Sequence, residues 1–171
     1  TFHRVSQHTL MAAALAASIV FAGCATHRAP AQPANLAAAA MQESELSTFN
    51  QLVQQAGMQD ALQGSAPMTV FAPTNEAFKA LPSATLEALS KNPDELRKVL
   101  KHHVVPGVHT QASIQGATMM STVGGTKLPI SKAGDYLTVE SGLVIKGDIQ
   151  TSNGVLHIID AVALPPKPKK K

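Results

Sequence analysis

Residues 68–78 read MTVFAPTNEAF, a segment that changes from one kind of secondary structure to another within a few residues. The apolar and β-branched run Met68–Ala72 predicts a short strand. Pro73 has no amide hydrogen to donate to a sheet, and Thr74 is a favoured helix N-cap. We therefore predict a buried strand that passes directly into a short helix, which returns Phe78 to the core.

Apolar residues at helical spacing lie on both sides of this segment. Upstream, the pattern from Leu46 to Ala56 predicts a helix, and Gly57 is placed to end it. Downstream, a helix is predicted from about Ser83, and the next is expected to begin at the N-cap Asn92.

The helix after Asn92 carries two adjacent histidines that its periodicity separates. Its apolar face has the i, i+3, i+4, i+7 spacing and holds Leu96, Val99, Leu100 and His103. We therefore predict that His103 is buried with this face and that His102 points elsewhere.

After Gly116 the pattern changes to short strands joined by glycine-containing turns. Strands are predicted at 118–123, 126–130, 137–139, 143–145 and 155–159. Such pairs of strands and turns are typical of antiparallel sheets. Because the helices come first and the strands second, the fold class predicted is α+β and not alternating α/β.

The start of the chain differs from the rest. An apolar run from Leu10 to Ala22 follows Arg4, and it is shorter than the roughly 20 residues that a transmembrane helix needs. The run ends in small residues and Cys24, which resemble a bacterial lipobox, and Cys24 is the single cysteine of the chain. We predict that residues 1–23 are a signal peptide and that Cys24 carries lipid.

The remaining organisation follows from composition and charge. We expect a lipid-anchored spacer at 24–35, one domain at 36–166 and a basic tail at 167–171. The formal net charge is +3, but residues 36–166 hold eight Lys and Arg against eleven Asp and Glu, a net charge of −3. The chain also has no Trp and one Tyr. A nucleic-acid surface needs clustered positive charge and stacking aromatics, so no nucleic-acid partner is expected.

Three segments in order resemble the motifs of the fasciclin (FAS1) domain family: residues 68–78, HVVPG at 103–107 and NGVLHIID at 153–160. The resemblance covers about residues 36–166 and implies helices packed on a wedge-shaped antiparallel β-sandwich. Most motif residues are interpreted as structural; they are Phe71, Pro73, Thr74, Phe78, His103, Asn153, Gly154 and His157.

The resemblance also suggests hypothetical partner-binding residues. A Tyr-His pair is implicated in adhesion by animal relatives; here His103 matches, but His102 stands where the family usually has tyrosine. An Asp-Ile pair is implicated as well, and Asp148-Ile149 matches it. A structural alternative stays open, in which Ile149 packs and Asp148 caps a turn.

Three functions are considered. The first is a non-catalytic adhesion or protein-interaction module of the bacterial cell envelope, in the periplasm or at the outer membrane, or secreted if Cys24 is not lipidated. Its partner would be a protein or a glycan. No catalytic or cofactor motif is found, and no cofactor is expected. The second is a carrier of an apolar ligand such as a carotenoid or lipid, bound by Met119, Met120, Val123, Leu128, Ile130 and Leu137.

The third function is a metalloenzyme in which four histidines gather round a metal ion. They are His102, His103, His109 and His157. A buried histidine whose ring nitrogens bind backbone groups is the simpler interpretation, and no metal site is predicted.

Overall fold

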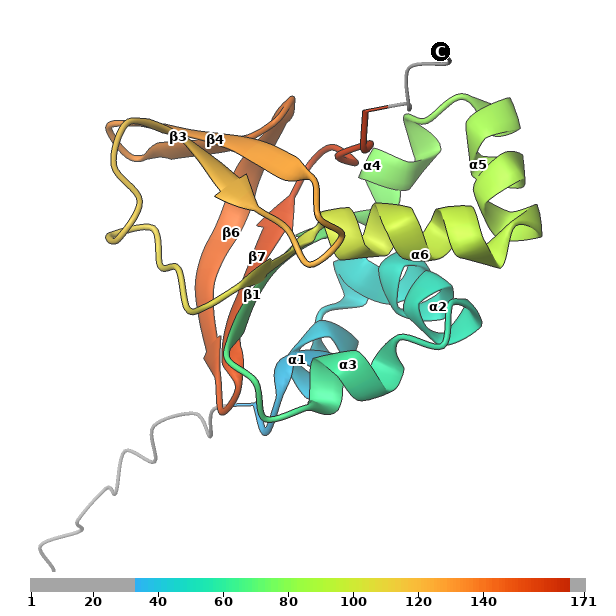
Figure 1. Cartoon of the computed structure of the whole chain (residues 1–171), viewed down its shortest axis with the longest axis horizontal. Coiled ribbons are helices and arrows are strands. Elements are labelled where there is room, and N and C mark those ends of the chain that lie inside the picture. The colour runs from blue at the N-terminus through green and yellow to red at the C-terminus, as the bar shows by residue number, and fades with distance from the viewer. Residues whose placement is uncertain (1–32, 167–171) are drawn as a thin grey trace, which may run out of the picture. The chain divides into compact units, whose positions relative to one another are not determined.

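The computed structural model describes residues 33–166, in which helices pack against a curled sheet (Figure 1). The predicted signal peptide, Cys24, most of the predicted spacer and the basic tail lie outside the described residues. The end of that spacer takes part in the fold. The Asn35 side chain caps α1 (Leu36–Gln42) by accepting a hydrogen bond from the Ala38 amide at 2.8 Å.

Most of the helices precede most of the strands, which confirms the α+β class. After α1 come η1 (Ser44–Leu46), α2 (Ser47–Gln55), α3 (Gln59–Gln63), α4 (Asn75–Lys79), α5 (Ser83–Lys91) and α6 (Pro93–His102). Gly57 follows α2 with φ 63°, and the Asn92 side chain caps α6, both as predicted. Two helices were not predicted from the sequence: α1, which is rich in alanine, and α3, which has only five residues.

The strands are β1 (Met68–Pro73), β2 (Val104–Pro106), β3 (Ala117–Ser121), β4 (Lys127–Ala133), β5 (Tyr136–Val139), β6 (Gly142–Thr151) and β7 (Gly154–Ile159). Their order in the sheet is β2-β1-β7-β6-β5-β4-β3. Every neighbouring pair is antiparallel except β1 and β7, which run parallel. Parallel pairing places two strands that are distant in sequence side by side in the interior of the sheet.

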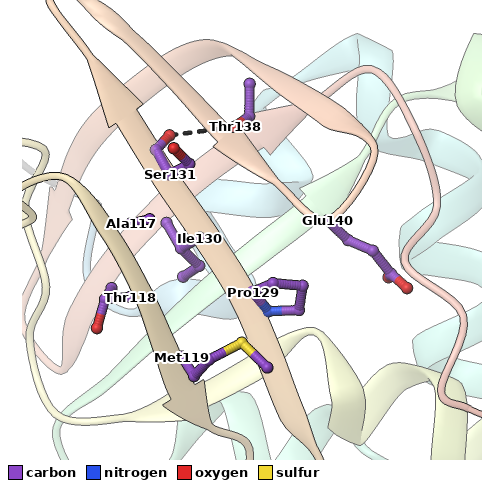
Figure 2. A pocket seen from close by; sticks show the side chains of 8 residues that line it. All are labelled: Ala117, Thr118, Met119, Pro129, Ile130, Ser131, Thr138 and Glu140. Carbon is purple, nitrogen blue, oxygen red and sulfur yellow. Dashed lines mark hydrogen bonds between the residues drawn. The ribbon is translucent and has the colours of Figure 1, made fainter.

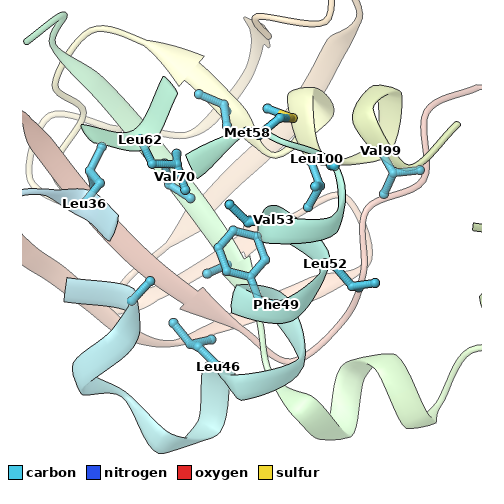
Figure 3. Close-up of a cluster of buried hydrophobic side chains, with 14 of the residues drawn as sticks. Leu36, Leu46, Phe49, Leu52, Val53, Met58, Leu62, Val70, Val99 and Leu100 are labelled. Atoms are coloured by element: carbon cyan, nitrogen blue, oxygen red, sulfur yellow. The ribbon is translucent and has the colours of Figure 1, made fainter. Parts of the chain in front are cut away.

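Strands β1 and β7 are buried on both faces, because alternate side chains enter two different cores. Val70 of β1 belongs to the first core, between the sheet and the helices (Figure 3). Leu156 of β7 belongs to the same core. Phe71 and Ile159 point the other way, into a second core.

The second core lies between the two halves of the curled sheet. It joins Phe71 to side chains from the distal strands, Leu128, Ile130, Leu137 and Val139. The curled sheet is nearly closed at its edges, since the Val123 amide beyond β3 donates to the Val104 carbonyl of β2 at 2.8 Å. The two halves therefore face each other as a sandwich.

Strand β6 contains two bulges. Val144 and Lys146 pair with the consecutive residues Ile159 and Ile158, so β6 has one extra residue there. A second extra residue lies between Lys146 and Ile149. This irregular stretch contains Asp148.

Candidate functional site

His103, at the C-cap of α6, is fully enclosed by the protein. The Ala163 amide donates to its Nε2 at 3.0 Å, so Nδ1 carries the proton and donates to the Val99 carbonyl at 2.8 Å. Burial lowers the pKa of His103 to about 4, although the bond to Val99 opposes this shift. The ring is therefore neutral and joins α6 to the segment that follows β7.

His102 is buried as well, with 1% of the residue exposed, so the prediction that it points away from the packed face is wrong. Its Nδ1 lies 2.5 Å from the Thr126 hydroxyl in the β3–β4 turn. Its Nε2 lies 3.8 Å from a carboxylate oxygen of Glu140 in the β5–β6 turn. These two turns cover the side of α6 that the helical pattern alone assigns to solvent. In this structure neither member of the His102-His103 pair is presented to a partner.

Asp148 and Ile149 have different environments. Asp148 is exposed and adopts the left-handed conformation, with φ 57°. Its Oδ1 accepts a hydrogen bond from the Gln111 amide at 2.8 Å. Ile149 is partly buried and packs against the first core. Asp148 is thus the member of this pair that a partner can reach.

His157 connects this region to the centre of the sheet. The ring stacks on Phe71 with centroids 5.3 Å apart, and it is completely buried. Nδ1 accepts from the Asp148 amide at 3.3 Å, and Nε2 donates to the His109 carbonyl at 2.8 Å. Burial lowers the pKa of His157, while the hydrogen bond to His109 and the charge of Asp148 oppose that shift.

The β2–β3 loop, residues 107–116, crosses beside this histidine. Apart from His109 in the metal hypothesis, its residues were not identified from the sequence as part of a site. Lys132 donates to the Gln111 carbonyl at 2.6 Å, which holds the loop to β4. A Cβ added to Gly147 would lie 1.8 Å from Gln111 Nε2 and 2.9 Å from His157 Nδ1. Only glycine allows the loop to come this close to β6. In a sequence, a glycine inside a strand is the signal of such a close approach.

The remaining motif residues hold the fold. Thr74 caps α4 by accepting from the Ala77 amide at 3.2 Å, as predicted. Asn153 accepts from the Leu36 amide and donates to the carbonyls of Leu62 and Gly64, which fastens α1 and α3 to the β6–β7 turn. Phe71 lies in the second core and Phe78 in the first, and Pro73 ends β1. A Cβ on Gly154 would lie 1.9 Å from the Met68 carbonyl oxygen.

The four histidines considered for a metal do not form one cluster. Within residues 33–166, no group of three or more His, Cys, Asp or Glu side chains is placed to hold a metal ion.

Five of the six residues considered for an apolar ligand lie on two faces of the sheet, and Val123 lies in the β3–β4 turn. Leu128, Ile130 and Leu137 are buried in the second core, whereas 61% of Met119 is exposed. On the outer face, β3, β4 and the end of β5 form a hollow of about 450 Å³ (Figure 2). Its lining includes Met119, Pro129 and Glu140.

The fold and these contacts define a fasciclin-type module, in which helices and a curled sheet meet around the buried histidine of the second motif. Residues 44–165 match the family model described as Fasciclin domain. The chain belongs to the fasciclin domain family.

Known proteins resemble the chain over most of its length. Protein sll1483 of Synechocystis sp. is 43% identical over 122 residues, which cover 70% of this chain and 67% of that protein. Immunogenic protein MPB70 of Mycobacterium bovis is 34% identical over 168 residues, covering 90% of this chain and 86% of that protein.

A solved structure shows the same fold. It is a FAS1 domain pair from the insect cell adhesion molecule Fasciclin I, with a TM-score of 0.63 and 14% identity, and the match covers 78% of this chain and 51% of that one. No helix among residues 33–166 is long and apolar enough to cross a membrane.

Proposed function

We propose that this protein is a non-catalytic adhesion or interaction module of the bacterial cell envelope. Membership of the fasciclin family supports the proposal, as does the fold shared with the FAS1 domain pair of the insect cell adhesion molecule Fasciclin I. The partner would be an envelope or extracellular protein or a glycan.

The observation that carries the proposal is the presentation of Asp148. Its carboxylate is at the surface, while the residue is held at two points: its backbone amide donates to His157, and its side-chain Oδ1 accepts from the Gln111 amide. A charged group fixed in this way loses little conformational freedom on binding and forms strong hydrogen bonds to a cationic or N–H donor. Ile149 then supports the contact from within the domain.

The test isolates the charge of Asp148 from its structural role. Asparagine keeps an oxygen that accepts the Gln111 amide and tolerates the left-handed conformation, so Asp148→Asn removes little besides the charge. Against an envelope component captured by the purified protein, we expect affinity to fall at least tenfold, about 1.4 kcal/mol, with an unchanged melting temperature. Asp135→Asn, in the exposed β4–β5 turn, is the matched control and should bind normally.

The possible outcomes separate the site from the function. If Asp148→Asn binds as tightly as the wild type, Asp148 is not a contact, and the adhesion surface lies elsewhere. If no envelope protein or glycan is captured in a saturable manner, the adhesion function itself is refuted.

The placement on the envelope rests on Cys24. Fatty-acid labelling of the expressed protein should be abolished by Cys24→Ser if this residue carries lipid. Equal labelling of the variant would exclude the anchor and leave secretion as the alternative.

A carrier of an apolar ligand is the second candidate, supported by the outer hollow that Met119 and Pro129 line. Colour or extractable lipid in the purified protein, lost in Met119→Ser, would favour it. A colourless, lipid-free protein that still binds envelope material would favour adhesion.

A further inference from the structure

The His102 side chain contains a buried nitrogen without a partner. Among the described residues, His102 Nε2 is the buried side-chain nitrogen or oxygen that makes no hydrogen bond. Burying such an atom unpaired is costly, and native proteins contain few examples. The histidine therefore gives up a stabilising interaction at a position where the family usually has tyrosine.

The contacts of the other ring nitrogen indicate what Nε2 can do. The Thr122 hydroxyl donates to the Thr126 carbonyl at 3.0 Å, and its oxygen lies 2.8 Å from the Thr126 hydroxyl. If Thr126 donates to Thr122, its own oxygen is left to accept from His102 Nδ1 at 2.5 Å. In this arrangement Nδ1 carries the proton, and Nε2 is a free base.

A carboxylate faces that base at a distance that fits neither a hydrogen bond nor a bridging water. Glu140 Oε2 is 3.8 Å from Nε2, beyond hydrogen-bonding range. A water bonded to both atoms would need them about 4.5 Å apart. Glu140 has φ 56°, an unusual conformation for a residue other than glycine. Of its side chain, 34% is exposed. The partly exposed carboxylate has room to shift, with a backbone hydrogen bond with Leu164 to hold it, whereas Thr126 holds the buried ring.

We propose that His102 and Glu140 form an acid-operated latch between the end of α6 and the β5–β6 turn. A proton from solvent binds Nε2, which then donates it in a hydrogen bond to the Glu140 carboxylate and draws the turn about 1 Å closer to the helix. Loss of that proton releases the turn. Because Glu140 also lines the outer hollow, the latch changes one wall of that hollow.

Burial of the two groups favours sharing of the proton by this pair. Burial lowers the pKa of His102 and raises the pKa of Glu140, which a backbone hydrogen bond with Leu164 opposes. Both shifts bring the two proton affinities closer together, as expected of groups that exchange one proton. His102 has His103, whose neutral ring has its centroid 6.4 Å away, and the exposed Lys101 as titratable neighbours in sequence. On the β3–β4 turn, the exposed Lys127 follows Thr126 at the start of β4.

The test is an NMR titration of the histidine rings in the whole protein, from about pH 8 to about pH 5. In Glu140→Gln, which keeps the size of the side chain and removes its charge, proton binding by His102 should weaken at least tenfold, one pKa unit. Asp135→Asn should leave the His102 titration unchanged. An unchanged or raised pKa of His102 in Glu140→Gln would overturn the latch.

A second measurement needs no substitution at all. In the wild type, the carboxyl carbon of Glu140 and the ring of His102 should report the same midpoint, because one proton affects both. Independent midpoints would overturn the proposal even if the variant failed to fold. The latch does not depend on the proposed adhesion function, so either result leaves that function to its own test.

Discussion

Acidification should destabilise this domain through its buried histidines, and His103 provides the clearest case. Its Nε2 accepts the Ala163 amide, so a proton can bind there only if that hydrogen bond breaks. Burial adds to this penalty and lowers the pKa of His103 from 6.5 to about 4. In the unfolded chain the same ring titrates near 6.5.

The sign and size of the effect follow from these two values. Between pH 6.5 and about 4 the unfolded state binds a proton that the folded state refuses, so stability is present above this window and falls as pH falls through it. A change from about pH 7 to about pH 5 should lower the unfolding free energy by about 2 kcal/mol through His103 alone. Burial also lowers the pKa of His102 and His157, which contribute in the same direction.

Urea unfolding of the wild type and His103→Gln at both pH values measures this contribution. Glutamine does not titrate, and its amide can both donate and accept a hydrogen bond. Groups common to both proteins cancel in the comparison, so the variant should lose about 2 kcal/mol less than the wild type over the same change of pH.

A control is Gln150→Asn, an exposed position in β6 without a titratable side chain, which should keep the acid sensitivity of the wild type. If His103→Gln and the wild type lose the same stability on acidification, His103 is not the neutral, enclosed group described above, and the reasoning fails.

Three substitutions test the packing around the site, each by its denaturant midpoint. His102→Ala should cost about 1–3 kcal/mol, because it empties a buried position and removes the partner of Thr126; a change below about 0.5 kcal/mol would mean that His102 is exposed in solution. Gly147→Ala should cost about 1–2 kcal/mol, because its Cβ would overlap Gln111 and His157. Asn153→Ala should cost about 3 kcal/mol by leaving buried backbone groups unpaired, and a loss under about 1 kcal/mol would show that water replaces the amide.

Local chemistry was sufficient to predict much of the helical part of the fold. Asn92 and Pro93 start α6 because capping and a fixed φ act within one turn, and Thr74 caps α4 for the same reason. His103 was correctly assigned to the buried face, since helical spacing determines which side chains lie together.

The burial of His102 could not be predicted from local chemistry. Helical periodicity assigned it to the open side of α6, but Thr126 and Glu140 cover that side, and they follow it by 24 and 38 residues. The position of such turns depends on the pairing of β3 with β4 and of β5 with β6. No pattern within the helix contains that information.

Sequence periodicity does not predict the position of Asp148 either, and the reason determines how the site should be tested. In a regular strand, Ile145 and Ile149 would lie on one face, yet 51% of Ile145 is exposed while Ile149 packs against the first core. The second bulge of β6, at Gly147 and Asp148, separates them and also turns the Asp148 carboxylate toward solvent. A substitution that disturbs the bulge would alter both stability and any binding through Asp148, so it could not distinguish a contact from a structural residue. Asp148→Asn keeps the bulge and removes the charge, and it therefore separates the two.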